Sequence, residues 1–120
     1  MSSISSRARL GIVVLVVLVS VTGATVVTDA AGDRALAAEE AYLDDRLAAA
    51  DCLDSYGTAE IVVSERARVV AVRPTGLVVA VRHPYAYSTT DLEADDASEA
   101  RYLVGPTATE RLVGDRIDPC

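Results

Sequence analysis

The feature that most constrains this chain is an uncharged apolar segment near its start. The eighteen residues from Leu10 to Val27, LGIVVLVVLVSVTGATVV, contain no charged side chain. As a helix rising ~1.5 Å per residue, such a segment spans roughly 27 Å, close to the ~30 Å hydrocarbon core of a bilayer. Because lipid offers backbone amides no partners, the valines are held in a helix there despite their preference for strands. We therefore expect residues 10–28 to form a transmembrane helix.

The charges on the two sides of this segment indicate its orientation. Arg7 and Arg9 precede it, whereas all eighteen acids and nine of the eleven arginines follow it. The positive-inside rule then places residues 1–9 in the cytoplasm and the rest of the chain outside the cell, as a single-pass protein of the cell membrane. The alternative is a secretory signal peptide, with small residues for cleavage at Thr22-Gly23-Ala24 and a poorer site at Thr28-Asp29-Ala30.

Composition excludes several classes of protein. A chain of 120 residues allows one small domain, and a net charge of −7 argues against binding to nucleic acid, which needs a cationic surface. Every basic side chain is arginine, and the chain contains no Lys, Asn, Gln, Phe or Trp. This usage resembles that of halophilic archaeal proteins, whose dense carboxylates keep them hydrated at high salt.

An amphipathic helix is expected over residues 33–56. Asp33 is a suitable N-cap and Gly57 a natural stop. Leucines and alanines recur at helical spacing and form one apolar stripe, with charged residues mostly off it. The stripe contains Leu36, Leu43, Leu47, Ala50 and Leu53; the residues placed off it are Glu39, Asp44, Asp45, Arg46 and Asp51.

Residues 58–120 are expected to form a small antiparallel sheet of three to four strands. The β-branched runs 59–63, 66–73, 77–87 and 101–104 predict strands, and Pro74-Thr75-Gly76 predicts a hairpin turn. Alternation along 77–87 places Leu77, Val79, Val81, His83, Tyr85 and Tyr87 on one face and Val78, Ala80, Arg82 and Ala86 on the other. We expect 88–100 to be an acidic loop and 110–113 a helical turn. The fold class is thus α+β, with the helix packed on the sheet.

Cys52 and Cys120 are the only cysteines. In an exported domain they are read most simply as one disulfide, which would tie the amphipathic helix to the end of the chain. An intermolecular bridge through Cys120 and two free thiols are the alternatives. A domain with so few large side chains needs such a staple.

The remaining chemically active side chains predict no catalytic, metal or cofactor site. His83, the only histidine, lies near Ser88, but no nucleophile motif surrounds them, so a strand histidine is favoured over a base that activates Ser88 or Cys52. One histidine cannot form a zinc cage. Asp91, Glu93, Asp95 and Asp96 alternate as Ca²⁺ ligands do but lack the EF-hand glycine, so we interpret them as a solvated loop, with a weak divalent site as the alternative.

The tyrosines suit either a core or a contact surface. Tyr85, Tyr87 and Tyr102 are expected to cluster on one sheet face, chiefly as core, because the chain has no other large side chains. Tyr42 projects off the leucine stripe, where it could contact another helix.

In outline the chain resembles small type IV pilin-like and minor pilin-like proteins of haloarchaea. The resemblance consists of a short basic N-terminus, an apolar helix that runs into an amphipathic one, and a compact antiparallel sheet. It implies that the apolar helices pack together in an assembly. Arg9-Leu10-Gly11 approximates the family's cleavage signal, although Leu10 separates the arginine from the glycine, and Val16 stands where bacterial pilins have an acid.

These features predict a non-enzymatic, membrane-anchored extracytoplasmic protein with a structural or assembly role. Its expected partners are the lipid bilayer and other membrane or pilin-like proteins, contacted through the N-terminal helix. The alternative is an anchored or secreted module that binds a peptide, a glycan or a divalent ion. An enzyme that uses Ser88 and His83 is the third hypothesis.

Overall fold

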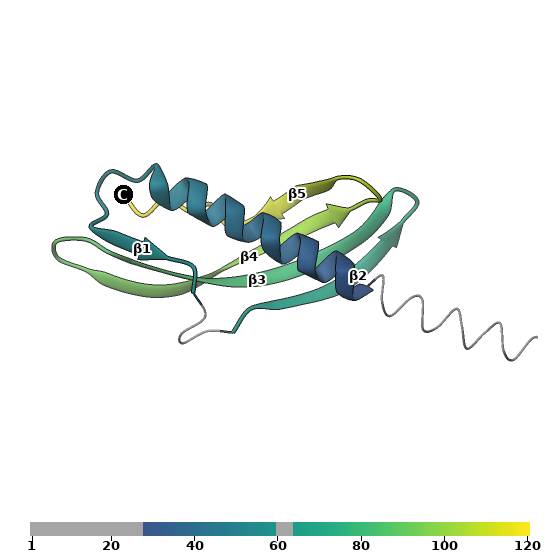
Figure 1. Ribbon diagram of the computed structural model, residues 1–120, viewed down its shortest axis with the longest axis horizontal. Coiled ribbons are helices and arrows are strands. Elements are labelled where there is room, and N and C mark those ends of the chain that lie inside the picture. The colour runs from purple at the N-terminus through teal and green to yellow at the C-terminus, as the bar shows by residue number, and fades with distance from the viewer. Residues whose placement is uncertain (1–27, 60–63) are drawn as a thin grey trace, which may run out of the picture. The chain divides into compact units, whose positions relative to one another are not determined.

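The computed structural model describes residues 28–59 and 64–120. The chain divides into two compact units, residues 1–30 and 31–120. Of the first unit only residues 28–30 are described, and they are helical. The second unit is α+β: one helix packs on a five-stranded antiparallel sheet (Figure 1). This confirms the expected α+β class, with a helix packed on a small antiparallel sheet, but the sheet has five strands where three to four are predicted.

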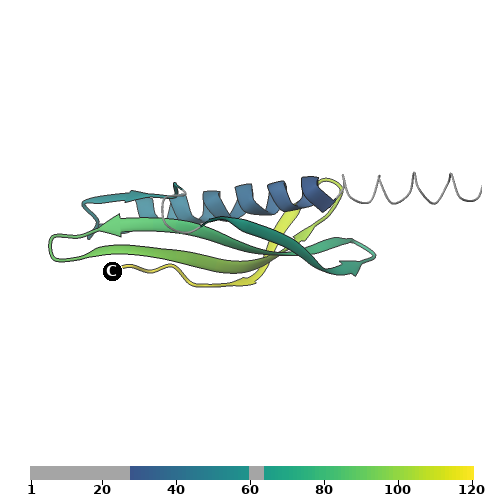
Figure 2. The ribbon, with the colours of Figure 1, turned by 90° about the horizontal axis from the view of Figure 1, so that it is seen from below.

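The helix covers residues 28–48, and every fourth residue of it is buried. These residues, which face the sheet, are Ala31, Ala35, Glu39, Leu43 and Leu47. Figure 2 shows the helix lying along one face of the sheet. A spacing of four keeps side chains on one side of a helix, so this ridge is the surface that the sheet covers.

The helix differs from the predicted 33–56 at both ends. It passes through Gly32 without a break, and a side chain there would approach within 3.3 Å of Ala67 Cβ, so glycine permits close packing on the sheet. At the other end the helix stops at residue 48. The chain must turn there because Cys52 reaches Cys120 and the next residues join the sheet. Tertiary contacts thus override the helix preference of Ala49 and Ala50.

The sheet contains β1 (Ser55–Gly57), β2 (Arg66–Arg73), β3 (Gly76–Ser88), β4 (Glu93–Val104) and β5 (Thr109–Gly114). The central strand β3 pairs with β4 along its whole length, and β5 follows β4. On its other edge β3 pairs with β2 over residues 76–82 and with β1 over residues 86–88. Pro84, which has no N–H, lies between these two pairings, where no ladder bond is needed.

Two segments assigned to other structure in the sequence are strands. The acidic residues 93–100, expected to be a loop, form the first part of β4, and residues 110–113, expected to be a helical turn, lie in β5. Small side chains alternate with charged ones along β4, so one of its faces can pack on the helix while the other meets solvent. Of the strand predicted at 59–63, residues 60–63 lie outside the described residues.

The predicted hairpin at 74–76 is present, and it connects β2 to β3. Gly76 has a φ of 155°, and a Cβ on it would collide with the carbonyl oxygen of Val104. Only glycine satisfies both conditions, since other residues rarely adopt this backbone conformation and no other lacks the colliding atom.

The core consists of two clusters between the helix and the sheet. The first contains Ala31, Ala35, Val79, Val81, Ala100, Tyr102 and Val104. The second contains Leu43, Leu47 and Ile117, with Tyr85 and Tyr87 packed against it. The odd-numbered residues of β3 thus face the helix from Val79 to Tyr87, as the alternation along this strand predicts. Ile117 brings the C-terminal tail into the core.

No helix in the described parts of the chain is both long and apolar enough to cross a bilayer. The predicted span, residues 10–28, lies outside these parts except for its last residue.

Candidate functional site

The two cysteines form the predicted disulfide. Cys52 and Cys120 are joined with their Cα atoms 5.9 Å apart, across 68 residues of sequence. The backbone N–H of Cys52 also donates a hydrogen bond to Cys120 Sγ, at 3.3 Å. The bridge connects the turn after the helix to the C-terminal tail, so the tail is held next to the C-terminal end of the helix.

His83 and Ser88 do not form a nucleophile–base pair. They are five residues apart on β3, which separates them by roughly 17 Å and turns them to opposite faces of the sheet. His83 is buried, with Nε2 3.5 Å from the carboxylate of Glu65 and Nδ1 2.9 Å from the carbonyl of Pro84. Ser88 Oγ lies 2.6 Å from Ser55 Oγ. Cys52 is in the disulfide, so neither proposed nucleophile is available to His83.

The acidic residues at 91–96 do not converge on one point. Asp95 and Asp96 are consecutive in β4, so their side chains point to opposite faces. Asp96 Oδ2 accepts a 3.4 Å hydrogen bond from Tyr85, so this carboxylate is directed to Tyr85 and not to the other acids of the segment. Within residues 28–59 and 64–120 no group of three or more potential ligands is placed to hold a metal ion.

A buried carboxylate, Glu39, lies at the centre of the helix–sheet interface. The helix places it on the buried ridge, and its side chain is 0% exposed. Its Oε1 accepts hydrogen bonds of 2.9 Å from both Tyr102 Oη and Arg111 Nε. Its Oε2 accepts bonds of 3.1 Å from Ser98 Oγ and 3.3 Å from Arg111 Nη2. The carboxylate is therefore paired with a cation and fully hydrogen-bonded.

This cluster connects three elements that are far apart in sequence. Glu39 comes from the helix, Ser98 and Tyr102 from β4, and Arg111 from β5. Burial and the hydrogen bond to Glu39 raise the pKa of Tyr102, because both favour the neutral phenol. Burial lowers the pKa of Arg111, but the hydrogen bonds and charge of Glu39 outweigh this effect and leave it raised. Because these hydrogen bonds and the ion pair connect the helix to β4 and β5, the cluster stabilises the packing of the helix on the sheet.

The other tyrosines are also engaged within the chain. The guanidinium of Arg111 lies over the ring of Tyr42, 3.8 Å from its centroid, so Tyr42 supports the Glu39 cluster. Its predicted use as a contact to another helix is not needed to explain its position. Tyr85 and Tyr87 lie on one face with their ring centroids 6.3 Å apart, next to the second core cluster.

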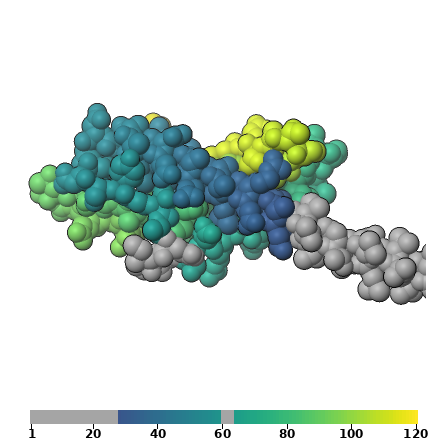
Figure 3. Space-filling view, in the orientation of Figure 1, coloured from purple at the N-terminus to yellow at the C-terminus, as the bar shows by residue number. Residues whose placement is uncertain are grey.

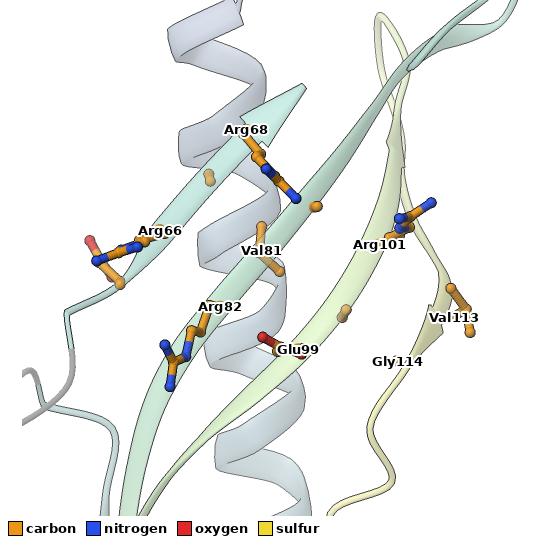
Figure 4. Close-up of a pocket in the computed structure, with 12 residues that line it drawn as sticks. Arg66, Arg68, Val81, Arg82, Glu99, Arg101, Val113 and Gly114 are labelled. Carbon is orange, nitrogen blue, oxygen red and sulfur yellow. The ribbon is translucent and has the colours of Figure 1, made fainter. Parts of the chain in front are cut away.

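Besides the Glu39 cluster, the unit has a groove on the face of the sheet that is turned away from the helix. It has a volume of about 850 Å³ and is lined by residues of β2, β3, β4 and β5. Figure 4 looks onto this face, with the helix behind the sheet. Four arginines line it: Arg66, Arg68, Arg82 and Arg101. We call this feature the arginine groove.

Strand register explains why the arginines gather there. Arg66 and Arg68 alternate along β2, so both point to the same face, and they lie opposite Arg82 and Ala80 of β3. Across β3, Ala80 is opposite Arg101 of β4. The small side chain of Ala80 therefore forms the floor, with Arg68 and Arg101 on its two sides about 10 Å apart, two strand spacings.

The groove carries excess positive charge in an acidic protein. Besides the four arginines it contains the acids Glu65 and Glu99. Among the described residues the ion pairs join His83 to Glu65, Arg111 to Glu39 and Arg116 to Asp118. None of these pairs involves a groove arginine, although Arg82 lies opposite Glu99. The groove is thus suited to an anionic partner.

Sequence reasoning missed both the Glu39 cluster and the arginine groove. Glu39 follows Leu36 by three residues and precedes Leu43 by four, a spacing that places it on the apolar stripe; this signal could have identified it. The alternating Arg66 and Arg68 signalled one basic face. The position of Arg101 beside them depends on the pairing of β3 with β4, which a loop predicted over 88–100 does not reveal.

Comparison of the chain with protein-family models, curated proteins and solved structures found no match.

Proposed function

We propose that this chain is a non-enzymatic, membrane-anchored extracytoplasmic protein with a structural or assembly role, of the kind that minor pilin-like subunits have. The observation that carries the proposal is the helix. It is already formed at residue 28, directly after the apolar segment 10–27 in sequence, and from residue 31 it is locked along the sheet. An apolar segment followed at once by a rigid helix-and-sheet module is the arrangement expected of an anchored subunit.

Two further features support an extracytoplasmic assembly role. The disulfide between Cys52 and Cys120 is typical of a protein that matures in an oxidising compartment. The side chains that could have formed a catalytic pair, His83 and Ser88, lie on opposite faces of β3. Instead, the polar side chains in the interior of the unit 31–120 hold helix and sheet together.

Site-specific labelling in intact cells tests the membrane topology. Val72→Cys places a thiol on a 78% exposed side chain of β2, and Ser5→Cys places one before the apolar segment. A membrane-impermeant maleimide should label the first variant in intact cells and the second only after lysis. Labelling of Ser5→Cys but not Val72→Cys in intact cells, or of neither, would contradict the proposal.

The arginine groove favours a second candidate function, the binding of an acidic peptide or an anionic glycan. Guanidinium groups bind carboxylates and sulfates through charge-assisted, often bidentate, hydrogen bonds. Titration of the full chain in detergent with dextran sulfate, and with neutral dextran as the control, measures this activity. Saturable binding that Arg68→Gln/Arg101→Gln removes would support it; equal binding of both polymers or of both proteins would contradict it.

A further inference from the structure

The unit 31–120 carries a local group of arginines in the groove of its sheet and a group of exposed acids on its helix. The sheet carries the arginine groove, whereas the outward side of the helix carries exposed acids. These are Asp33, Glu40, Asp44 and Asp45. Figure 3 shows the molecule from the side of the helix, whose surface is coloured blue. The helix also carries Arg34 and Arg46, which donate to the carbonyl oxygens of Gly105 at 2.6 Å and of Ile117 at 2.9 Å and form no ion pair with these acids.

Within the described residues of the single chain, no ion pair neutralises the arginines of the groove. Arg66 and Arg82 are directly opposite each other across β2 and β3, and like charges in this position destabilise a sheet. Glu99 lies on the other side of Arg82, but it forms no ion pair with it. An anionic surface laid on the groove would relieve this repulsion, so binding would be coupled to a gain in stability of the sheet.

The shape of the groove fits a helix that has small residues at its centre. The floor at Ala80 lies between arginines about 10 Å apart, and an α-helix with its side chains measures ~10–12 Å across. On the outward side of the helix, alanines at positions 37, 41 and 48 are exposed between the acids. These alanines can approach the floor, which leaves the acids on either side to meet the arginines.

We propose that the arginine groove binds the outward side of the helix of a second copy of this chain. The inference deepens the proposed assembly function and rests on it. Contacts between two grooves or between two helices would bring like charges together, so charge selects the groove–helix pairing. Such a contact uses two different surfaces and can repeat from copy to copy. Anchoring in one membrane raises the effective concentration of the copies.

Each contact in this arrangement depends on direct guanidinium–carboxylate pairs. Concentrated salt screens charges that are more than about 3–10 Å apart and leaves pairs at hydrogen-bonding distance. A copy shifted perpendicular to the plane of the sheet, without rotation, presents its helix to the neighbour's groove. The reason is that the helix lies on one face of the sheet (Figure 2) and the groove on the other (Figure 4).

Disulfide crosslinking of the full chain in its membrane tests the geometry. Val113→Cys places a thiol on an exposed side chain of the groove, and Ala41→Cys places one on the outward side of the helix. Oxidation of the double variant should yield a ladder of dimers, trimers and larger species. Each single variant is a matched control and should remain monomeric. Dimers from Val113→Cys alone or from Ala41→Cys alone, without a ladder from the double variant, would overturn the proposal.

Charge exchange then tests the pairing itself. In the double-cysteine background, Arg68→Glu/Arg101→Glu and Asp44→Arg/Asp45→Arg should each lower the crosslinked fraction by roughly tenfold or more, as expected when charge-assisted pairs are lost. Membranes that contain both charge variants together should recover the crosslink. Binding of dextran sulfate with no ladder in any variant would assign the groove to another anion and overturn the proposal.

The crosslinking result is separable from the membrane topology. The labelling of Val72→Cys and Ser5→Cys reports on the anchor and does not depend on contacts between copies. If Val72→Cys is labelled in intact cells but no ladder forms, the groove–helix contact is overturned and the proposed anchoring stands. A ladder in a chain that fails the labelling test would support the contact and contradict the anchoring.

Discussion

At the residue scale, the position of Glu39 shows how one charged side chain can organise an interface. The unit 31–120 has few large apolar side chains, and Glu39 occupies the middle of its buried ridge. Burying a carboxylate is costly unless it is paired and hydrogen-bonded, and here four hydrogen bonds and one cation meet that requirement. The ion pair also fixes which part of the helix faces β4 and β5.

Glu39→Gln should reduce the free energy of unfolding by about 3–5 kcal/mol, because it leaves Arg111 charged and without its partner. The matched control is Glu40→Gln, the neighbouring exposed glutamate, which accepts one hydrogen bond from Thr58. This control should change the unfolding free energy by no more than about 0.5 kcal/mol. Denaturant unfolding of both variants measures the difference. Equal unfolding free energies of the two variants would contradict the role of the Glu39 cluster in stabilising the helix–sheet interface.

Gly76→Ala should destabilise the protein by about 2–4 kcal/mol, since it combines backbone strain with the collision at Val104. Gly57→Ala is the control, because nothing lies within 4 Å of the position that its Cβ would take. Thermal unfolding of the two variants provides the comparison. Equal unfolding temperatures of Gly76→Ala and Gly57→Ala would contradict the close approach of the hairpin to β4 that the structure shows.

Stability should fall as pH rises above 10. Burial, together with the charge of Asp96, raises the pKa of Tyr85 to about 12, and burial with Glu39 raises that of Tyr102 further. The unfolded chain loses these protons near pH 10, so between pH 10 and 12 it binds fewer protons than the folded chain and is increasingly favoured. Denaturant midpoints across this range measure the effect. Tyr102→Phe should flatten the decline, whereas the exposed-site control Tyr56→Phe should preserve it.

The sequence identified residues whose environment is set by neighbours along the chain. The face of β3 that carries Val79, Val81 and His83 followed from alternation alone. The spacing of Glu39 from Leu36 and Leu43 shows that it lies on the apolar stripe. Its partner cannot be found in this way, because Arg111 is 72 residues away and no local pattern links the two.

At the element scale, the limits of prediction lie where pairing overrides local preference. Residues 93–100 have low strand propensity, yet they complete β4 because β3 offers them a full ladder of hydrogen bonds. Their small residues Ser98 and Ala100 alternate with charged ones, a weak period-two signal that the acids obscure. The end of the helix at residue 48 likewise depends on the disulfide and on β1, which the pattern of helix formers does not reveal.

Replacing both cysteines, as Cys52→Ser/Cys120→Ser, should lower the unfolding free energy by about 4 kcal/mol. The bridge closes a loop across 68 residues, and opening it restores conformational freedom to the unfolded chain. The secondary structure should be unchanged in the folded variant, because the helix and β1 keep their other contacts. Denaturant unfolding with circular dichroism measures both quantities; a loss below about 1 kcal/mol would contradict the role of the bridge as a staple.

At the scale of the whole molecule, the unit 31–120 carries exposed acids on the outward side of its helix and a groove rich in arginine on the far face of its sheet. A net charge of −7 conceals this division, because the arginines gather only when β2, β3 and β4 pair in register. The proposed role combines this two-sided unit with an anchor at residues 10–28 that the sequence predicts. The sequence predicts function only as a location and a class, because the groove that we propose as the binding surface forms only in the folded chain.

The central claim is that the apolar segment remains attached to an exported, disulfide-bonded unit. The intact mass of the protein purified from its native membrane tests this most directly. We predict a membrane-bound chain that is uncut or lacks roughly eleven residues, and a gain of about two mass units on reduction. A soluble chain that lacks roughly 24–30 residues, or a mass that reduction does not change, would contradict the account.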